Sequence, residues 1–481
     1  MKRCFSIFAF LLFCFVFLQS CKNDKKQDVV FETEPLSLES RIDSIAQVHL
    51  DNGTVNGFSI AIRKDKELIY VKGFGFSDLE QSQPVTSETI FQMASVTKLF
   101  TATAIMMLVE QGKLTLDDYL IDILPDFPKK DQVEKIRVRH LLAHTSGLQN
   151  YAYAGDSLYA RSKSLIEKED YYKVFEMYDI KFEPGEYFSY SNSGFIAAML
   201  IIEKLSGMAY EDFIEINIAA PLELNSLKHI IRNRDRDMTR RFEPDSAGFK
   251  LNEMDSIYYF KGDGGLSTTA LDLSLFPYAL EEGALISAEA LQTMKEVSTF
   301  SNGLETNYGL GLRRGNLGGH EVFGHTGGNK GFWAVLGFYP EENTCITVFV
   351  NTELQSSDAL QIEAEIALEV FDVKRVNLEE KIKESHDLSR YRGDFAKNET
   401  HYVEPQLLTF FTKENQPYLF KKRKGSDQDG YKMIYLGDNT FVPENQVLDR
   451  TVFLEDAEGK IIGYQDYYNG FFIQLSHKVE E

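Results

Sequence analysis

The sequence is poor in positive charge. Lys and Arg number 51 against 73 Asp and Glu, which gives a formal net charge of −22 over 481 residues. Such an excess of acidic groups repels polyanions at long range, so nucleic acid is excluded as an expected partner. The chain also lacks internal repeats and long low-complexity tracts, and 43% of it is hydrophobic. It can therefore bury sizeable cores, and its length favours two domains.

Cysteine is also scarce. The four cysteines are Cys4, Cys14, Cys21 and Cys345. The first two lie in a segment that we expect to be removed, and we expect the third to carry lipid. Only Cys345 then remains, so we expect no internal disulfide and no metal site built from thiolates. No other feature of the sequence indicates a metal or a cofactor.

The first 20 residues are predicted to form a secretory signal of the lipoprotein type. Lys2 and Arg3 precede the apolar run CFSIFAFLLFCFVFL, which is shorter than the length that a membrane-spanning helix usually needs. The next residues, LQSC, resemble a bacterial lipobox that ends at Cys21, the residue to be lipidated. The alternative is an ordinary secretory signal with a chance cysteine. With lipid on Cys21, residues 21–37 would be a polar tether, and the protein would be a membrane-anchored lipoprotein of the periplasm or the cell surface.

Hydrophobic periodicity predicts an α+β domain over 38–376. We expect a helix at 41–51, two strands within 57–75 that turn near 64–66, and a helix from about Ser95 to Gln111 that ends at Gly112. Strands return between 307 and 352. The expected fold is an antiparallel sheet flanked by helices, with an all-helical subdomain. Further helices are expected at 134–144, 192–205, 209–217, 270–282, 287–296 and 356–371.

The pattern changes at Leu388 to short strand-like runs, such as QPYLFKKRK and YKMIYLG, separated by charged or Gly/Asn turns. This spacing predicts a small C-terminal antiparallel β domain over 388–481, for which a barrel is one form. The charged stretch NLEEKIKESHD, residues 377–387, is the expected boundary.

Ser95 and Lys98 carry the first chemical signal, within FQMASVTKLF. They are three residues apart, so on a helix they share one face, and their neighbours are mostly apolar. A serine hydroxyl is a poor nucleophile until a base takes its proton. A lysine can do so where burial or a nearby cation favours its neutral form. The alternative is a lysine that reaches water, and a chain of this length holds about one or two Ser-x-x-Lys pairs by chance.

Two further signals follow along the chain. PGEYFSYSNSGF contains Tyr190, which can relay a proton, and Asn192, which can orient a lysine and bind a substrate group. The same Tyr-x-Asn form recurs at 467–469, where we interpret it as a turn. FGHTGGNKGF then places four residues in a predicted strand that a substrate could lie beside and whose amides could face an oxyanion. A simple hairpin turn is the alternative. The four residues are His325, Thr326, Gly327 and Gly328.

The three motifs are Ser-x-x-Lys, Tyr-x-Asn and His-Thr-Gly. β-Lactamases and penicillin-binding proteins carry variants of the same three motifs in the same order along the chain. The sequence resembles the serine β-lactamase-like and penicillin-binding-protein-like hydrolases, namely class C β-lactamases, D-aminopeptidases and esterase relatives, over about residues 40–372. VRHLLAHTSGL (138–148), GDGGLSTTALDLSLF (262–276) and ITVFVNTE (346–353) are also similar to that family. The tail is similar to the small β domains, some of them lipocalin-like, that certain members carry.

The resemblance implies a serine hydrolase that forms an acyl-enzyme on a peptide, amide or ester, including substrates that contain D-amino acids. It makes Ser95 the nucleophile, Lys98 its base and Tyr190 the assistant in proton transfer to the leaving group. Asn192 would hold Lys98 and a substrate amide. The backbone amides of Ser95 and Gly328 would form the oxyanion hole. The expected substrate edge consists of His325, Thr326 and Gly327.

One position departs from the family pattern. β-Lactamases and many D,D-peptidases have lysine where His325 stands, and a lysine attracts a substrate carboxylate, whereas histidine is mostly neutral at pH 7. This favours a peptidase or esterase over a penicillin hydrolase. The alternative function is a sensor that binds penicillins or cell-wall fragments without turnover. We interpret His140 and His144 as structural residues, and Asp263 as a turn aspartate rather than an acid at the rim of the site.

Overall fold

The computed structural model describes residues 36–80, 82–151, 168–233, 238–246, 248–251, 261–329, 331–353, 358–397 and 406–479. The predicted signal sequence, Cys21 and nearly all of the predicted tether lie outside these residues. Leu38–Glu481 form one compact unit.

The central antiparallel sheet is built from the two ends of the predicted α+β domain. β1 (Gly57–Lys64) pairs with β2 (Glu67–Asp78) on one side and with β12 (Thr344–Val350) on the other. The order then continues through β11 (Phe332–Tyr339), β10 (His320–Asn329) and β9 (Arg313–Leu317). The turn between β1 and β2 uses Asp65 and Lys66, both with positive φ. The predicted α+β fold is therefore confirmed, although the strand expected from 307 begins only at Arg313.

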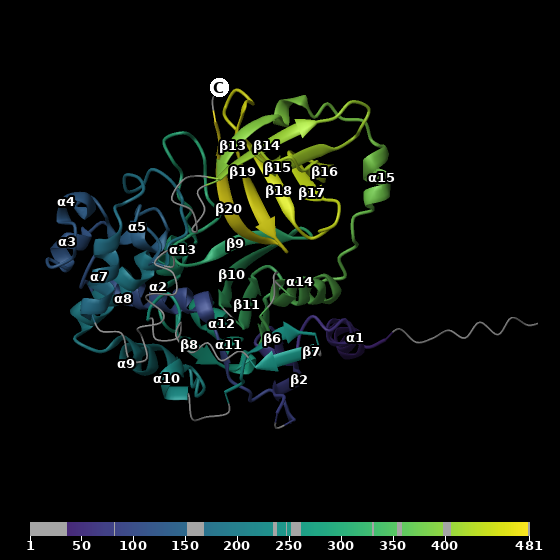
Figure 1. Ribbon diagram of the computed structural model, residues 1–481. Coiled ribbons are helices and arrows are strands. Elements are labelled where there is room, and N and C mark those ends of the chain that lie inside the picture. Colours follow the sequence, from purple (N-terminus) through teal and green to yellow (C-terminus); the bar gives the residue numbers. More distant parts are fainter. Residues whose placement is uncertain are drawn as a thin grey trace, which may run out of the picture. The chain divides into compact units, whose positions relative to one another are not determined.

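Two helices cover one face of this sheet (Figure 1). α1 (Leu38–Asp51) and α14 (Asp358–Val370) pack against each other, and α14 also packs against β11 and β12. Apolar side chains of these helices and of the sheet make one continuous core. This core closes the side of the sheet that faces away from the predicted catalytic helix.

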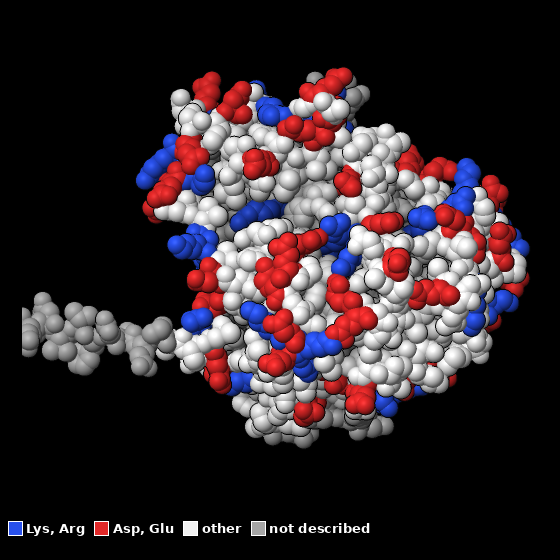
Figure 2. All heavy atoms as spheres, turned by 180° about the vertical axis from the view of Figure 1, so that it is seen from behind, with Lys and Arg blue, Asp and Glu red and all other residues white. Residues whose placement is uncertain are grey.

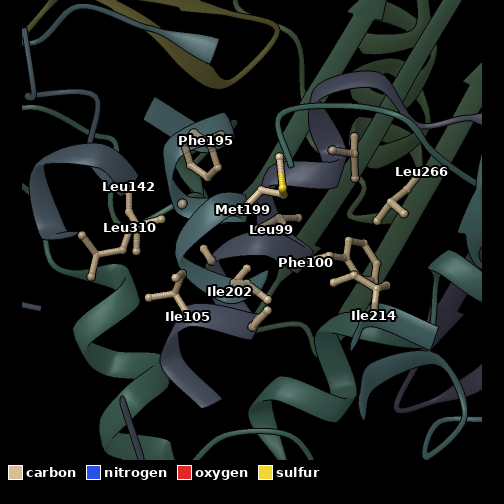
Figure 3. Packing of buried hydrophobic residues seen from close by; sticks show 14 of the residues in the cluster. Leu99, Phe100, Ile105, Leu142, Phe195, Met199, Ile202, Ile214, Leu266 and Leu310 are labelled. Atoms are coloured by element: carbon tan, nitrogen blue, oxygen red, sulfur yellow. The ribbon is translucent and has the colours of Figure 1, made fainter. Parts of the chain in front are cut away.

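The helices with the predicted catalytic residues form a second core. α2 (Thr97–Glu110) and α8 (Asn192–Ser206) are apolar nearly all round, as is typical of buried helices. Leu99 and Ile105 of α2 lie with Met199 and Ile202 of α8 in one cluster (Figure 3). The remaining helices of this region are α3 (Leu120–Ile123), α4 (Lys130–Val133), α5 (Val138–Leu142), α7 (Lys168–Met177), α9 (Tyr210–Ile214), α10 (Ile230–Asn233), α11 (Ala270–Leu273), α12 (Phe276–Glu281) and α13 (Ala288–Lys295).

In the part of the chain described above, no single helix is long and apolar enough to span a membrane, and one bent pair, Asn192–Ser206 with Tyr210–Ala219, passes on length and composition alone. Ten residues of α8 are buried inside the protein. Burial in the core therefore accounts for the apolar character of α8.

Three small groups of strands complete the α+β region. β4 (Phe91–Gln92) and β5 (Lys228–His229) both pair with β8 (Leu266–Thr268). β6 (Phe242–Asp245) pairs with β7 (Gly248–Leu251), and β3 (Gln83–Pro84) pairs with the end of β2. β4 ends three residues before Ser95 in the chain, so its pairing with β8 fixes the approach to that residue.

The C-terminal strands form a closed barrel. Each of β13 to β20 pairs with the next, all antiparallel, and β13 returns to pair with β20. The predicted C-terminal β domain is therefore confirmed as a barrel. The interpretation of 467–469 as a turn holds only for Asn469, because Tyr467 and Tyr468 are the last residues of β19. α15 (Leu378–Lys383) lies at the expected boundary. The strands are β13 (Gly393–Lys397), β14 (Gln406–Thr412), β15 (Leu419–Arg423), β16 (Tyr431–Gly437), β17 (Thr440–Pro443), β18 (Arg450–Glu455), β19 (Ile461–Tyr468) and β20 (Phe471–Lys478).

The barrel is also joined to the central sheet. Phe471 of β20 pairs with Gly315 of β9, and the Asn316 amide donates to the Gly470 carbonyl oxygen at 3.0 Å. A Cβ on Gly315 would lie 1.9 Å from that same oxygen, so only glycine permits this approach. The two sheets are therefore hydrogen-bonded into one.

Acidic and basic side chains are interspersed on the surface. On the face seen in Figure 2, basic residues lie among acidic ones and make no continuous basic area. That face therefore offers no extended surface for a polyanion.

Glu363 gives the first prediction, on stability. It is fully buried on α14, the Tyr339 hydroxyl donates to its Oε1 at 2.8 Å, and its Oε2 has no partner among the described residues. Burial raises the pKa of Glu363 from 4.5 to about 8, against the smaller lowering effect of Tyr339. The folded state therefore holds a proton that the unfolded state has lost between those two pH values, so stability falls as pH rises from 4.5 to 8.

Replacing Glu363 by glutamine keeps the shape and removes this titration. At pH 8.5 we expect Glu363→Gln to raise the free energy of unfolding by about 2–4 kcal/mol, and at pH 4.5 by less than about 1 kcal/mol. Urea unfolding at the two pH values measures the difference. Equal effects at both would show that Glu363 is ionised in the folded protein.

Candidate active site

Ser95 lies in a tight turn directly before α2. The sequence analysis placed it in the first turn of an α-helix, but it belongs to the 3₁₀ turn Ala94–Val96, and α2 begins at Thr97. The preceding residue, Ala94, has φ +44°, a left-handed conformation that costs energy for a residue with a Cβ. The Met93 amide donates to the Leu266 carbonyl oxygen at 2.9 Å, which ties the turn to β8. Ser95 is therefore held by a strained, anchored turn.

Lys98 is fully buried beside Ser95. Its Nζ lies 3.0 Å from Ser95 Oγ and donates to the Asp263 carbonyl oxygen at 2.7 Å. Neither of these partners is a carboxylate, so neither neutralises a charge on the amine. The expectation of a buried lysine next to the serine is met by this geometry, and a hydroxyl within hydrogen-bond distance of an amine is the arrangement of a nucleophile and its base.

Tyr190 borders the same amine. The Nζ of Lys98 lies 5.1 Å from the centre of the Tyr190 ring, and the Arg313 guanidinium carbon lies 5.1 Å from it as well. Asn192 begins α8, and its Oδ1 is buried without a partner among the described residues. The hydrogen bonds of Lys98 go to Ser95 and Asp263, so the side chain that holds Lys98 in the family pattern is here replaced by a backbone carbonyl. Asn192 keeps a free acceptor.

His325 is buried and neutral. Burial first, then the charges of Arg313 and Lys98, lower the pKa of His325 well below its ordinary value. Its Nδ1 lies 2.6 Å from the Thr326 carbonyl oxygen, which can only accept, so Nδ1 carries the proton. Nε2 then accepts from the Tyr308 hydroxyl at 2.9 Å. Both ring nitrogens are occupied, and His325 supplies no positive charge to a ligand.

The strand that carries His325 has a free edge next to Ser95. β10 pairs with β11 as far as Asn329 but with β9 only as far as Gly324. From His325 to Asn329, β10 therefore has no paired strand on the β9 side among the described residues, and Gly328 is exposed. An extended ligand can pair with such an edge.

Asp263 and two histidines complete the surroundings. Asp263 lies in a bend, as expected, but the interpretation as an ordinary turn aspartate is wrong, because its carboxyl is buried and accepts from the Tyr151 hydroxyl at 2.6 Å. Burial raises the pKa of this carboxyl above its ordinary value. The structural interpretation of the histidines is confirmed by their contacts: His140 Nδ1 accepts from the Arg137 amide, and His144 Nδ1 accepts from the Ser191 amide.

Arg313 and Tyr308 were missed by the sequence analysis. Arg313 is 7% exposed, and its Nη1 donates to the Phe472 carbonyl oxygen at 2.6 Å. The only sequence signal for it is an arginine pair in an otherwise apolar run, GLGLRRG. No group of three or more His, Cys, Asp or Glu side chains that could hold a metal ion is found in the described part of the chain.

Gly327 allows the strand to approach the serine turn. A Cβ at this position would lie 2.2 Å from the Met93 carbonyl oxygen and 3.0 Å from the Ser95 nitrogen. We expect Gly327→Ala to push β10 away from Ser95 and to lower kcat/KM by about 10². Gly264→Ala is the matched control, because its Cβ would make an ordinary contact of 3.9 Å with Ala94. Ester hydrolysis by both variants tests this, and equal rates would contradict it.

Comparison with known proteins gives consistent matches. Residues 42–370 match the protein-family model Beta-lactamase. Penicillin-binding protein 4* of Bacillus subtilis (strain 168) is 27% identical over 334 residues, which cover 66% of this chain and 71% of that protein.

Two solved structures share the fold. The octameric penicillin-binding protein homologue from Pyrococcus abyssi has a TM-score of 0.62 at 24% identity, and the match covers 91% of this chain and 99% of that chain. D-amino acid amidase from Ochrobactrum anthropi SV3, complexed with D-phenylalanine, has a TM-score of 0.62 at 23% identity, over 70% of this chain and 99% of that chain.

Proposed function

The chain belongs to the beta-lactamase family of serine hydrolases, and from this premise we propose that it hydrolyses a peptide, amide or ester through an acyl-enzyme on Ser95. The observation that carries the proposal is the 3.0 Å distance between Ser95 Oγ and the Nζ of the fully buried Lys98. A serine hydroxyl within hydrogen-bond distance of a buried amine is the arrangement of a nucleophile and its base.

The reaction follows from the positions of these groups. Lys98 Nζ takes the proton of Ser95 as Oγ bonds to the substrate carbonyl carbon. The resulting oxyanion accepts from the backbone amides of Ser95 and Gly328. Tyr190 assists the return of the proton to the leaving nitrogen or oxygen, the bond to that atom breaks, and water then hydrolyses the ester on Ser95. Asn192 Oδ1, which has a free acceptor, receives a substrate N–H.

The proposed substrate class follows from the charge of His325. His325 is neutral and both its nitrogens are bonded, which argues against recognition of a free carboxylate at this point and against efficient penicillin hydrolysis. A D-amino acid amide, a D-amino-acid peptide or an ester is the proposed substrate class. The D-amino acid amidase fold match is consistent with it. Anchorage to a membrane by lipid on Cys21, in the periplasm or at the cell surface, is part of the same proposal.

Intact-mass spectrometry of the chain from residue 22 tests the proposed function. We expect brief exposure to an activated short-chain ester to give a transient acyl adduct, and D-phenylalanine amide to be hydrolysed faster than its L-enantiomer. A penicillin should leave no lasting adduct. A stable penicillin adduct without turnover of the other substrates would identify a sensor instead. Absence of any adduct and any hydrolysis would overturn the proposal.

A further inference from the structure

The C-terminal barrel meets the α+β region at the strand that carries Arg313. β9 runs from Arg313 to Leu317, and Gly315 in its middle pairs with Phe471 at the start of β20. The close approach of Gly315 to Gly470 brings the barrel to the back of the candidate active site. Two separate sets of contacts connect the barrel to residues that border Ser95, Lys98 and Tyr190.

The first connection holds a buried cation. The Phe472 carbonyl oxygen of β20 accepts from Arg313 Nη1 at 2.6 Å, and Arg313 Nε has no partner among the described residues. Because this acceptor is a carbonyl and not a carboxylate, it orients the guanidinium without cancelling its charge. The guanidinium carbon lies 5.1 Å from the Tyr190 ring centre and 5.6 Å from the Tyr308 ring centre. The barrel therefore places a positive charge beside the catalytic tyrosine.

The second connection holds the segment before Tyr308. Gln465 of β19 donates from Nε2 to the Glu305 carbonyl oxygen at 2.6 Å, and its Oε1 accepts from Asn307 Nδ2 at 3.0 Å. The same Asn307 amide donates to the Tyr467 hydroxyl, which in turn donates to Gln465 at 2.6 Å. The next residue along the chain, Tyr308, donates to His325 at 2.9 Å. The barrel therefore holds the segment that carries Tyr308, and Tyr308 contacts the substrate-edge strand.

Apolar packing supports both connections. Phe472 stacks edge-on against Phe188, two residues before Tyr190, with ring centres 5.5 Å apart. Leu475 and Tyr308 belong to the same buried cluster, and Tyr190 and Tyr467 pack on its border. This interface is therefore a continuous core and not a loose contact between two domains.

We propose that the C-terminal barrel is a structural part of the active site. The Phe472 carbonyl holds Arg313 beside Tyr190. Gln465 and Tyr467 hold the segment before Tyr308, so that the Tyr308 hydroxyl stays bonded to His325. Arg313, Tyr308, Gln465 and Tyr467 are then positioning residues. The Arg313 guanidinium is a permanent cation, and it lies beside the Tyr190 ring. This inference rests on the proposed function.

The effect of the Arg313 charge on Tyr190 can be separated from the effects of the histidines and the tyrosine around Tyr190. Burial lowers the pKa values of His144 and His325 well below the ordinary range, so both are neutral, and burial raises that of Tyr308. The Lys98 amine and the Arg313 guanidinium are the basic groups in contact with the Tyr190 ring in the described structure. The titratable and charged groups that face Tyr190 are Lys98, His144, Tyr308, Arg313 and His325.

Variants of Arg313 test the charge. We expect Arg313→Met to lower kcat for an ester by about 10–100-fold with little change in KM, because the substitution removes the cation beside Tyr190. Arg313→Lys should restore most of kcat. A raised KM with unchanged kcat would make Arg313 a substrate contact and overturn the proposal.

A matched pair of tyrosines tests the role of the barrel. Tyr467→Phe removes a hydroxyl that bonds Asn307 of the α+β region, whereas Tyr391→Phe removes one that bonds Asn439 within the barrel. We expect kcat to fall by about 3–10-fold in Tyr467→Phe and by less than about 2-fold in Tyr391→Phe, at equal melting temperatures. Equal kcat values would overturn the proposal. Failure of the wild-type protein to acylate Ser95 would instead overturn the proposed function, so the two outcomes are distinguishable.

Discussion

Replacing Ser95 by alanine is expected to lower hydrolysis of an activated ester by at least about 10⁴-fold and to remove the acyl adduct completely. Ser95 Oγ is the hydroxyl next to the buried amine of Lys98, and no other serine of the described site has this neighbour. The fold should survive, because the side chain of Ser95 is small and its turn is held by backbone contacts of Met93. Stopped-flow hydrolysis and intact mass measure the effect.

Ser191 provides the matched control for Ser95. It lies between Tyr190 and Asn192, and its Oγ is buried without a hydrogen-bond partner among the described residues. Ser191→Ala therefore removes one hydroxyl from the same site without removing a bond, and we expect activity within about 2-fold of wild type. A Ser95→Ala variant that keeps a tenth of the rate would show that another group is the nucleophile.

Replacing Lys98 by methionine is expected to change activity and stability in opposite directions. Loss of the amine should lower the rate of Ser95 acylation by about 10³–10⁴-fold, because no other base is bonded to Ser95 Oγ in the described structure. Methionine fills the same apolar volume, and the cost of a buried amine is removed. We therefore expect the free energy of unfolding to rise by about 1 kcal/mol. Acylation kinetics and urea unfolding of one preparation measure both quantities.

Lys421 shows the opposite behaviour of a buried lysine. It lies in the barrel with its Nζ 3.0 Å from both carboxylate oxygens of Asp466. Lys421→Met leaves the Asp466 charge buried and unpaired, so we expect the free energy of unfolding to fall by about 3 kcal/mol. If Lys98→Met destabilised the protein as strongly, Lys98 would be a structural residue and its proposed role as base would be wrong.

The central fold and the motif residues could be predicted because their signals are local. Alternating apolar residues predicted β1 and β2, and Gly112 correctly marked the end of α2, where its φ is +66°. Ser95 and Lys98 are one turn apart, so their proximity follows from helix geometry alone. The exact 3₁₀ form of the Ser95 turn could not be predicted, because it depends on β8 and β10, which follow about 170 residues or more later in the chain.

The partners of the motif residues required the structure. The carbonyl oxygen that holds Lys98 belongs to Asp263, 165 residues away, and a backbone acceptor has no sequence signature. Arg313 is oriented by the Phe472 carbonyl, which is 159 residues away and belongs to the C-terminal barrel. The sequence of Asp263 and its glycine neighbours is typical of a turn. The burial of the Asp263 carboxyl depends on packing against Tyr151, which is distant in the sequence.

The joint between β9 and β20 also has a consequence for solubility. An unpaired strand at the end of a sheet offers its backbone groups to a second molecule, and proteins commonly shield such strands to prevent aggregation. β9 ends the series of strands that starts at β3, and the Gly470 carbonyl and Phe471 occupy its outer side. The barrel has no such exposed strand of its own because β13 closes on β20. The C-terminal strands thus act as a cap that keeps β9 from pairing with a strand of a neighbouring molecule.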